Sequence, residues 1–190
     1  VSGLITFIAA VHYWYMRDYW GAGNGSPIFF RYVDWILTVP LMCVEFYLIL
    51  KAAGATTKLL WRMITLSTIM LVTGYLGEAV YRGQAQIWGL VSGLAYFVIV
   101  YDIWMGEAKK LAVAAGGAVE SAHNMLAKFV LIGWAIYPLG YMVGTGQEPG
   151  QWYSFLAGAA EMDVIYNIGD AINKIGFGLV VYNLAVKSSK

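Results

Sequence analysis

The sequence predicts an all-α membrane protein, and its composition and the spacing of its apolar stretches support this prediction. Of its 190 residues, 60% are hydrophobic and only 12% are charged, whereas soluble domains carry about 25% charged residues. Six apolar stretches each approach or exceed the roughly 20 residues needed to cross a bilayer. We therefore expect residues 1–190 to form one domain, a bundle of six membrane-spanning helices.

The six stretches cover residues 2–20, 28–52, 59–80, 85–105, 124–145 and 164–186. The segments 21–27 and 145–150 are rich in Gly, with Pro in each, so they are expected to break helices. Residues 107–121 carry two lysines and a run of small residues, which indicates a loop or a frayed helix end. Because the chain starts inside an apolar run and without methionine, we expect upstream sequence with at least one further helix.

The composition also excludes several classes of function. The 12 Lys and Arg nearly balance the 11 Asp and Glu, so no broad basic surface is available for nucleic acid. Cys43 has no second cysteine to pair with, and His12 and His123 lie far apart. Disulfides, metal sites and nucleic-acid partners are therefore not expected.

The basic residues predict the orientation of the bundle, because cytoplasmic loops collect Lys and Arg. If successive stretches alternate in direction, eight basic residues fall on one side and two, Arg17 and Arg82, on the other. This bias predicts that the connections 51–62 and 107–128 and the C-terminus are cytoplasmic. The eight are Lys51, Lys58, Arg62, Lys109, Lys110, Lys128, Lys187 and Lys190.

Ionisable residues interrupt the second stretch at helical spacing. Asp34 and Thr38 lie one turn apart, and Glu45 lies about 20° past three full turns from Asp34 and about 16 Å further along the axis. Arg31 lies one turn before Asp34. Ionisable residues inside membranes are costly and commonly mark proton or ion paths, although a polar contact between helices would also explain them.

The last stretch carries Asp170 and Lys174 four residues apart. Lys174 lies about 15 Å into the helix, near the middle of a bilayer. Desolvation disfavours the charged ammonium and makes the amine nucleophilic, which suits imine formation with an aldehyde. A structural ion pair with Asp170 is the alternative.

An apolar aldehyde would need an aromatic cage. Trp35 adjoins Asp34, and Trp134, Tyr137 and Tyr141 recur at helical spacing around Pro138. Such a stripe is more often ordinary helix packing than a cofactor site.

In combination, the segments 31–40, 134–138 and 170–174, with Glu45, resemble the microbial rhodopsins, and among them the proteorhodopsins. The resemblance covers essentially the whole chain. It implies a heptahelical rhodopsin bundle of which the second to seventh helices are present. It also implies a light-driven outward proton pump rather than an enzyme, with all-trans retinal bound as a protonated Schiff base.

The resemblance assigns a role to each charged position. Lys174 would hold retinal, Asp34 would be the counterion and proton acceptor, and Asp170 the second counterion. Glu45 would be the cytoplasmic proton donor. Further expected members of the pathway are Arg31, which directs the released proton outward, Thr38 of the pump triplet, His12 beside the acceptor, and Tyr13 in the same network.

The resemblance also assigns the chromophore cage to Trp35, Trp134, Tyr137, Pro138 and Tyr141. Met42 would occupy the spectral tuning position, where an apolar side chain implies green absorption. Gly89, in place of a bulky residue near the ring, would open a side window for an antenna carotenoid.

The resemblance leaves other functions open. Sensory rhodopsins share Lys174 and Asp34 but commonly lack a carboxylate at the position of Glu45. Sodium and chloride pumps differ in the pump triplet or lack the acceptor. A retinal-free transporter remains the alternative of a different class. The family further implies the bacterial inner membrane and a homo-oligomer, a pentamer or hexamer.

Overall fold

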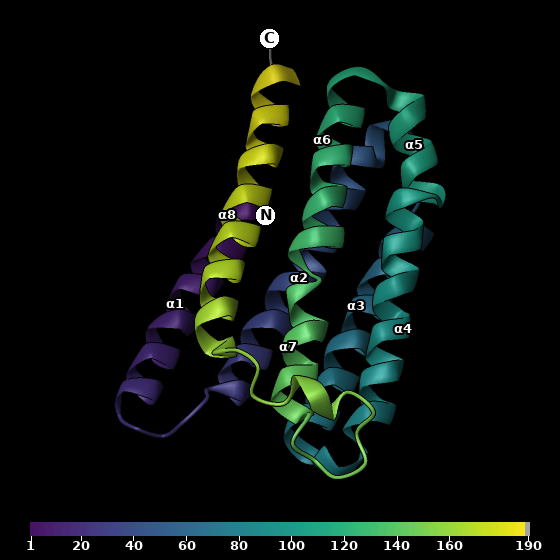
Figure 1. The fold of residues 1–190 in the computed structure, drawn as a ribbon. Helices are drawn as coiled ribbons and strands as arrows, with labels where there is room; N and C mark the ends of the chain where they lie inside the picture. Colours follow the sequence, from purple (N-terminus) through teal and green to yellow (C-terminus); the bar gives the residue numbers. More distant parts are fainter. Residues whose placement is uncertain (189–190) are drawn as a thin grey trace.

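The computed structural model describes residues 1–188, which form long helices packed side by side (Figure 1) and contain no β-strand. The longer helices are α1 (Ser2–Gly21), α2 (Ile28–Leu50), α3 (Thr57–Tyr75), α4 (Ala85–Trp104), α5 (Glu107–Ala115), α6 (Gly117–Lys128), α7 (Ile136–Thr145) and α8 (Met162–Ser188). Helix α2 packs against both α1 and α3, and α8 packs against α1, α6 and α7.

Five helical stretches among the described residues are long and apolar enough to cross a membrane: Ile28–Ala53, Thr57–Val80, Arg82–Ala115, Gly117–Thr145 and Met162–Lys187. The predicted stretch 2–20 also forms a helix, α1, but does not belong to this set. Its polar and amphipathic side chains, among them His12, Arg17 and Asp18, lower its mean hydropathy.

The expectation of a loop or frayed end at 107–121 is wrong. These residues form α5 and the start of α6, and the chain reverses direction between the two helices at Gly116 and Gly117. Both glycines have positive φ, 64° and 49°, a conformation that costs glycine little. Two glycines are therefore sufficient for the turn, and the alanine-rich flanks have high helix propensity.

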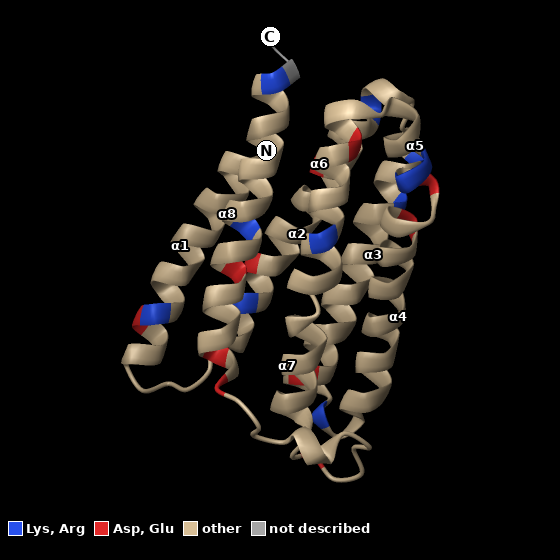
Figure 2. Ribbon diagram, turned by 45° about the horizontal axis from the view of Figure 1, so that its top comes forward, with Lys and Arg blue, Asp and Glu red and all other residues tan. Residues whose placement is uncertain are grey.

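The basic residues gather toward one end of the bundle. The C-terminal end of α8 and the α5–α6 turn lie at this end, whereas the α1–α2 and α7–α8 connections lie at the other (Figure 1). Lys and Arg are frequent around α5 and at the end of α8 (Figure 2). This distribution agrees with the alternation used to assign the eight residues, of which Lys190 lies outside the described residues.

The predicted stretch 124–145 is helical but not continuous. A π-helical turn, Phe129–Gly133, separates α6 from α7. Pro138 accounts for the irregular residues just after this turn, because it has no N–H to donate to the carbonyl of Trp134, which accepts from Tyr137 instead. Tyr96 of α4 donates to the carbonyl of Val130, 2.9 Å away, so a carbonyl within the irregular turn is satisfied. Trp134 and Tyr137, which follow the π-helical turn, line an interior cavity.

Candidate functional site

Lys174 of α8 lies buried between two carboxylates. Its Nζ donates hydrogen bonds to Oδ2 of Asp34 on α2 and, over 2.9 Å, to Oδ2 of Asp170. Lys174 is 5% exposed and both carboxylates are at most 1% exposed. The structure therefore brings together the three groups that the sequence predicted, and two carboxylates compensate the buried amine.

Asp170 is the centre of a hydrogen-bond network. Besides Lys174, it accepts hydrogen bonds from the hydroxyls of Tyr13 and Tyr137 and from Nε1 of Trp35 at 2.9 Å. These donors come from α1, α2 and the start of α7. This many donors fix the orientation of the Asp170 carboxyl group beside the amine.

Arg31 is 2% exposed and lies on the side of this network toward the α7–α8 connection. Its guanidinium donates to Asp163 at 3.0 Å and to Asn167 at 3.1 Å, and it lies 3.4 Å from the Tyr13 hydroxyl. The Asp163 side chain is 28% exposed. Arg31 thus bridges the buried network and a partly exposed carboxylate.

The two carboxylate oxygens of Asp34 differ: Oδ2 accepts a hydrogen bond from Lys174, whereas Oδ1 is open, that is, without a partner among the described residues. Nδ1 of His12 lies 3.9 Å from Oδ1. The His12 nitrogen is 2.9 Å from the carbonyl of Ile8. Thr38 donates to the backbone carbonyl of Asp34, not to its carboxylate. Oδ1 of Asp34 is therefore able to accept a proton.

Glu45 lies further along α2, and it is 2% exposed. Its Oε1 accepts a hydrogen bond from Ser2 of α1, while Oε2 has no partner among the described residues. Side chains of α1 lie near both carboxylates, His12 near Asp34 and Ser2 against Glu45, which agrees with the shared helix face that their spacing predicted. Glu45 lies nearer than Asp34 to the C-terminal end of α2, which is followed by Lys51 and Lys58.

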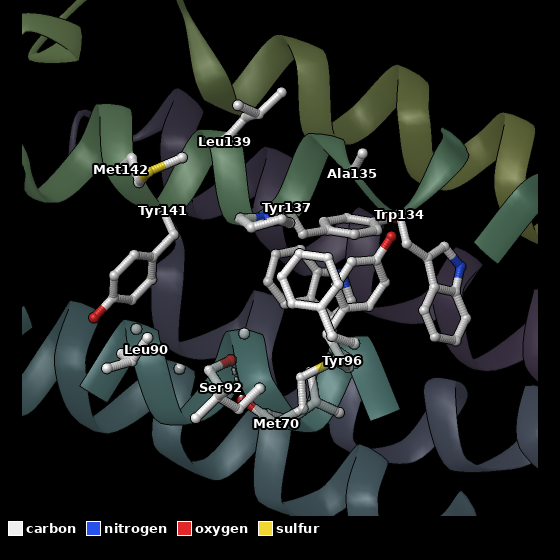
Figure 3. A pocket seen from close by; sticks show the side chains of 18 of the residues that line it. Met70, Leu90, Ser92, Tyr96, Trp134, Ala135, Tyr137, Leu139, Tyr141 and Met142 are labelled. Atoms are coloured by element: carbon white, nitrogen blue, oxygen red, sulfur yellow. Dashed lines mark hydrogen bonds between the residues drawn. The ribbon is translucent and has the colours of Figure 1, made fainter. Parts of the chain in front are cut away.

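A cavity of about 650 Å³ adjoins this network. Aromatic side chains from α4 and from the segment around α7 face each other across it (Figure 3). Trp35 and Tyr137 both line the cavity and donate to Asp170, so the cavity and the charged network share a wall. The predicted cage residues that line it are Trp35, Trp134, Tyr137, Pro138 and Tyr141.

Two further predicted residues lie differently. Met42 is 1% exposed in the core and is not among the residues that line the cavity. Gly89 does line it, but the ring of Tyr141 lies against it: a Cβ at Gly89 would come within 2.6 Å of Tyr141 Cε1. The space that glycine leaves is thus partly filled by Tyr141, whose hydroxyl donates to the carbonyl of Ala85.

The donor set fits a covalently attached apolar aldehyde. Lys174 supplies the amine, Asp34 and Asp170 supply compensating charge, and the aromatic cavity lies within the volume range typical of sites for small organic molecules, roughly 300–1,000 Å³. Among the described residues, no cluster of three or more His, Cys, Asp or Glu side chains could hold a metal ion.

The sequence interpretation missed several residues of the site. Tyr166 lines the cavity and stacks on Tyr137 with ring centroids 5.8 Å apart. Asp163 and Asn167 bind Arg31. Asp163 and Asn167, together with Asp170 and Lys174, recur every three or four positions along α8, so helical spacing alone could have placed these four on one face. Ser2 carried no comparable signal.

The family model and two curated relatives that match this chain are all rhodopsins. A family model described as bacteriorhodopsin-like protein matches residues 1–188. The green-light absorbing proteorhodopsin of Gamma-proteobacterium EBAC31A08 is 44% identical over all of this chain and 74% of its own length. The blue-light absorbing proteorhodopsin of Gamma-proteobacterium Hot 75m4 is 43% identical, over all of this chain and 73% of its own length.

A solved structure extends the agreement to three dimensions. The crystal structure of xanthorhodopsin, described as a light-driven ion pump with dual chromophore, superposes with a TM-score of 0.79 at 27% identity. The superposition covers 99% of this chain and 79% of that one. The helical arrangement is therefore that of the rhodopsins.

Proposed function

Because this chain belongs to the bacteriorhodopsin-like family and is a proteorhodopsin-like microbial rhodopsin, we propose that it is a light-driven proton pump that uses retinal attached to Lys174. The observation that carries the proposal is the Lys174 amine, buried between Asp34 and Asp170 beside an aromatic cavity. Bound retinal would supply the absorption of visible light and the light-driven change of shape that displaces the proton at Lys174.

The side chains around Lys174 have different roles in proton transfer. Asp34, with an open oxygen and a direct contact to Nζ, accepts the proton from Lys174. Asp170 stays ionised, since its donors stabilise the anion. Arg31, between this network and Asp163, stabilises negative charge on the outer side and directs the proton outward.

Glu45 returns a proton to Lys174 from the other side. Its buried carboxyl faces the same helix as Asp34 but lies about 16 Å away along α2, which separates uptake from release. The charge bias supports a cytoplasmic position for Glu45 and for the C-terminus, so pumping is outward. His12 and Thr38 complete the surroundings of Asp34.

The remaining assignments complete the proposal. The apolar Met42 supports green rather than blue absorption, and its side chain lies in the core rather than in the lining of the cavity. We expect insertion in a bacterial inner membrane and a pentamer or hexamer. Gly89 on the cavity wall, together with the likeness to a rhodopsin with dual chromophore, supports a carotenoid against α4 as a second chromophore.

Two measurements test the function. Added all-trans retinal is expected to produce a visible band that hydroxylamine bleaches and that Lys174→Ala lacks. A protein without this band is a retinal-free transporter or structural bundle.

The second measurement tests proton transport. Illuminated cells are expected to acidify their medium until a protonophore is added, and Asp34→Asn is the inactive control. A pigment that forms but moves no protons, with a photocycle lasting seconds, would identify a sensor.

A further inference from the structure

The cavity beside Lys174 reaches the outer surface of the bundle. Its inner wall includes Trp35 and Trp134, which are 5% and 4% exposed. Its outer wall includes Leu94 of α4 and Leu139 of α7, which are 58% and 51% exposed. One continuous space therefore connects the buried aromatic cage to the face that meets lipid.

At this opening, α4 contributes a residue without a side chain to the wall of the cavity. Gly93 lines the cavity, and a Cβ added there would meet no atom within 4 Å. Figure 3 shows that Leu90 and Ser92 of α4 lie across the cavity from Tyr141 and Leu139. The opening is thus bounded by apolar side chains and by the backbone of Gly93. No ion pair of the described residues crosses it.

Both ends of the bundle offer a worse route to Lys174. Toward the α7–α8 connection, the ion pair of Arg31 with Asp163 lies between the amine and water. Toward the opposite end, the interior is filled by Phe46, Phe177 and Leu126, each at most 1% exposed. A long apolar molecule would have to break buried contacts at either end.

We infer that the opening between α4 and α7, lined by Leu94, Leu139 and Gly93, is the port through which retinal passes from the bilayer to Lys174. This inference rests on the proposed retinal chemistry. An apolar aldehyde dissolves in the hydrocarbon core, where the port opens, and reaches the cage without crossing water or a charged layer. The imine forms at Nζ with release of one water molecule for each aldehyde bound.

The rate of pigment formation tests the port. Apoprotein in lipid vesicles is mixed with retinal-loaded vesicles, without carotenoid, and growth of the visible band is followed. Leu94→Trp or Leu139→Trp narrows the port, because the larger ring must move aside before the aldehyde can pass. We expect roughly tenfold slower growth, equivalent to about 1.4 kcal/mol. Leu94→Ala is expected to accelerate growth several-fold.

Val98 provides the matched control, because it is 44% exposed on the same helix but does not line the cavity. Val98→Trp and Val98→Ala are expected to keep the wild-type rate. The Val98 variants should also keep the wild-type band position, and the growth rate of each Leu94 or Leu139 variant is normalised to its own final amplitude, which separates access from binding. Equal rates in Leu94→Trp, Leu94→Ala and wild type would overturn the port, whereas absence of a band in the wild type would overturn the proposed function instead.

Discussion

At the residue scale, the buried charges of this chain differ in how completely they are paired. Asp170 has four donors, whereas Asp34 and Glu45 each keep one oxygen without a partner among the described residues. A buried, incompletely satisfied carboxylate is costly, so it is an unusual feature for purely structural residues. The two open carboxylates are the ones to which the proposal assigns proton transfer.

Replacement of Glu45 by Gln tests its role as proton donor. We expect the return of the proton to Lys174 to slow by about 100-fold or more, since a positioned acid or base contributes roughly 10²–10⁴-fold. Flash photolysis measures this step, and external azide should partly restore the rate. Ser2→Ala, which removes only the hydrogen bond to Glu45, should have a smaller effect. An unchanged decay in Glu45→Gln would remove Glu45 from the pathway.

At the element scale, close approach of α7 and α8 depends on a glycine. A Cβ at Gly140 would lie 2.0 Å from the Tyr166 hydroxyl and 2.4 Å from Tyr166 Cζ. Tyr166 is 4% exposed and its ring stacks on Tyr137, so it has little room to move. Gly144 follows one turn later, and small residues at this spacing commonly allow membrane helices to pack closely.

Gly140→Ala is therefore expected to destabilise the bundle by about 1–3 kcal/mol, the usual cost of overpacking. The midpoint of thermal unfolding of the pigment in detergent should fall. Gly3→Ala in α1 is the matched control, because it also replaces a helical glycine but meets open space and does not line the cavity; it should leave the midpoint unchanged or raise it, given the higher helix propensity of Ala. Similar midpoints for both variants would contradict the role of Gly140.

At the scale of the whole molecule, an apolar exterior replaces the polar surface of a soluble protein. Phe7, Leu90, Ile132 and Ile172 are each 60–68% exposed, and such side chains occur all around the bundle. Exposed apolar surface of this extent requires lipid. The polar ends then define two sides, and the basic residues are concentrated toward one of them (Figure 2).

The orientation can be measured with single cysteines, because native Cys43 is 1% exposed and provides a low background. Gln147→Cys lies in the α7–α8 connection and Ala115→Cys at the end of α5; both native side chains are exposed. A membrane-impermeant thiol reagent should label Gln147→Cys in intact spheroplasts and Ala115→Cys only after permeabilisation. The reverse pattern would invert the bundle and the direction of pumping.

Much of this architecture follows from sequence because it depends on local properties. Apolar length identified the stretches that became helices, and helical spacing placed Asp170 beside Lys174 and put Asp34 and Glu45 on one face of a helix. The loop expected at 107–121 was wrong because its lysines and small residues resemble a connection, although alanine and glutamate also favour a helix.

Other features depend on contacts between distant segments, which no local pattern encodes. The hydrogen bond from Ser2 to Glu45, the ion pair of Arg31 with Asp163 and the contact of Tyr141 with Gly89 each join different helices. Hydropathy and helical period are properties of single segments, so the amino-acid sequence is sufficient to establish the membrane class, the helices and the charged residues inside them. Packing between helices sets which carboxyl oxygens lack a hydrogen-bond partner and where the cavity meets lipid, so both became visible only in the folded bundle.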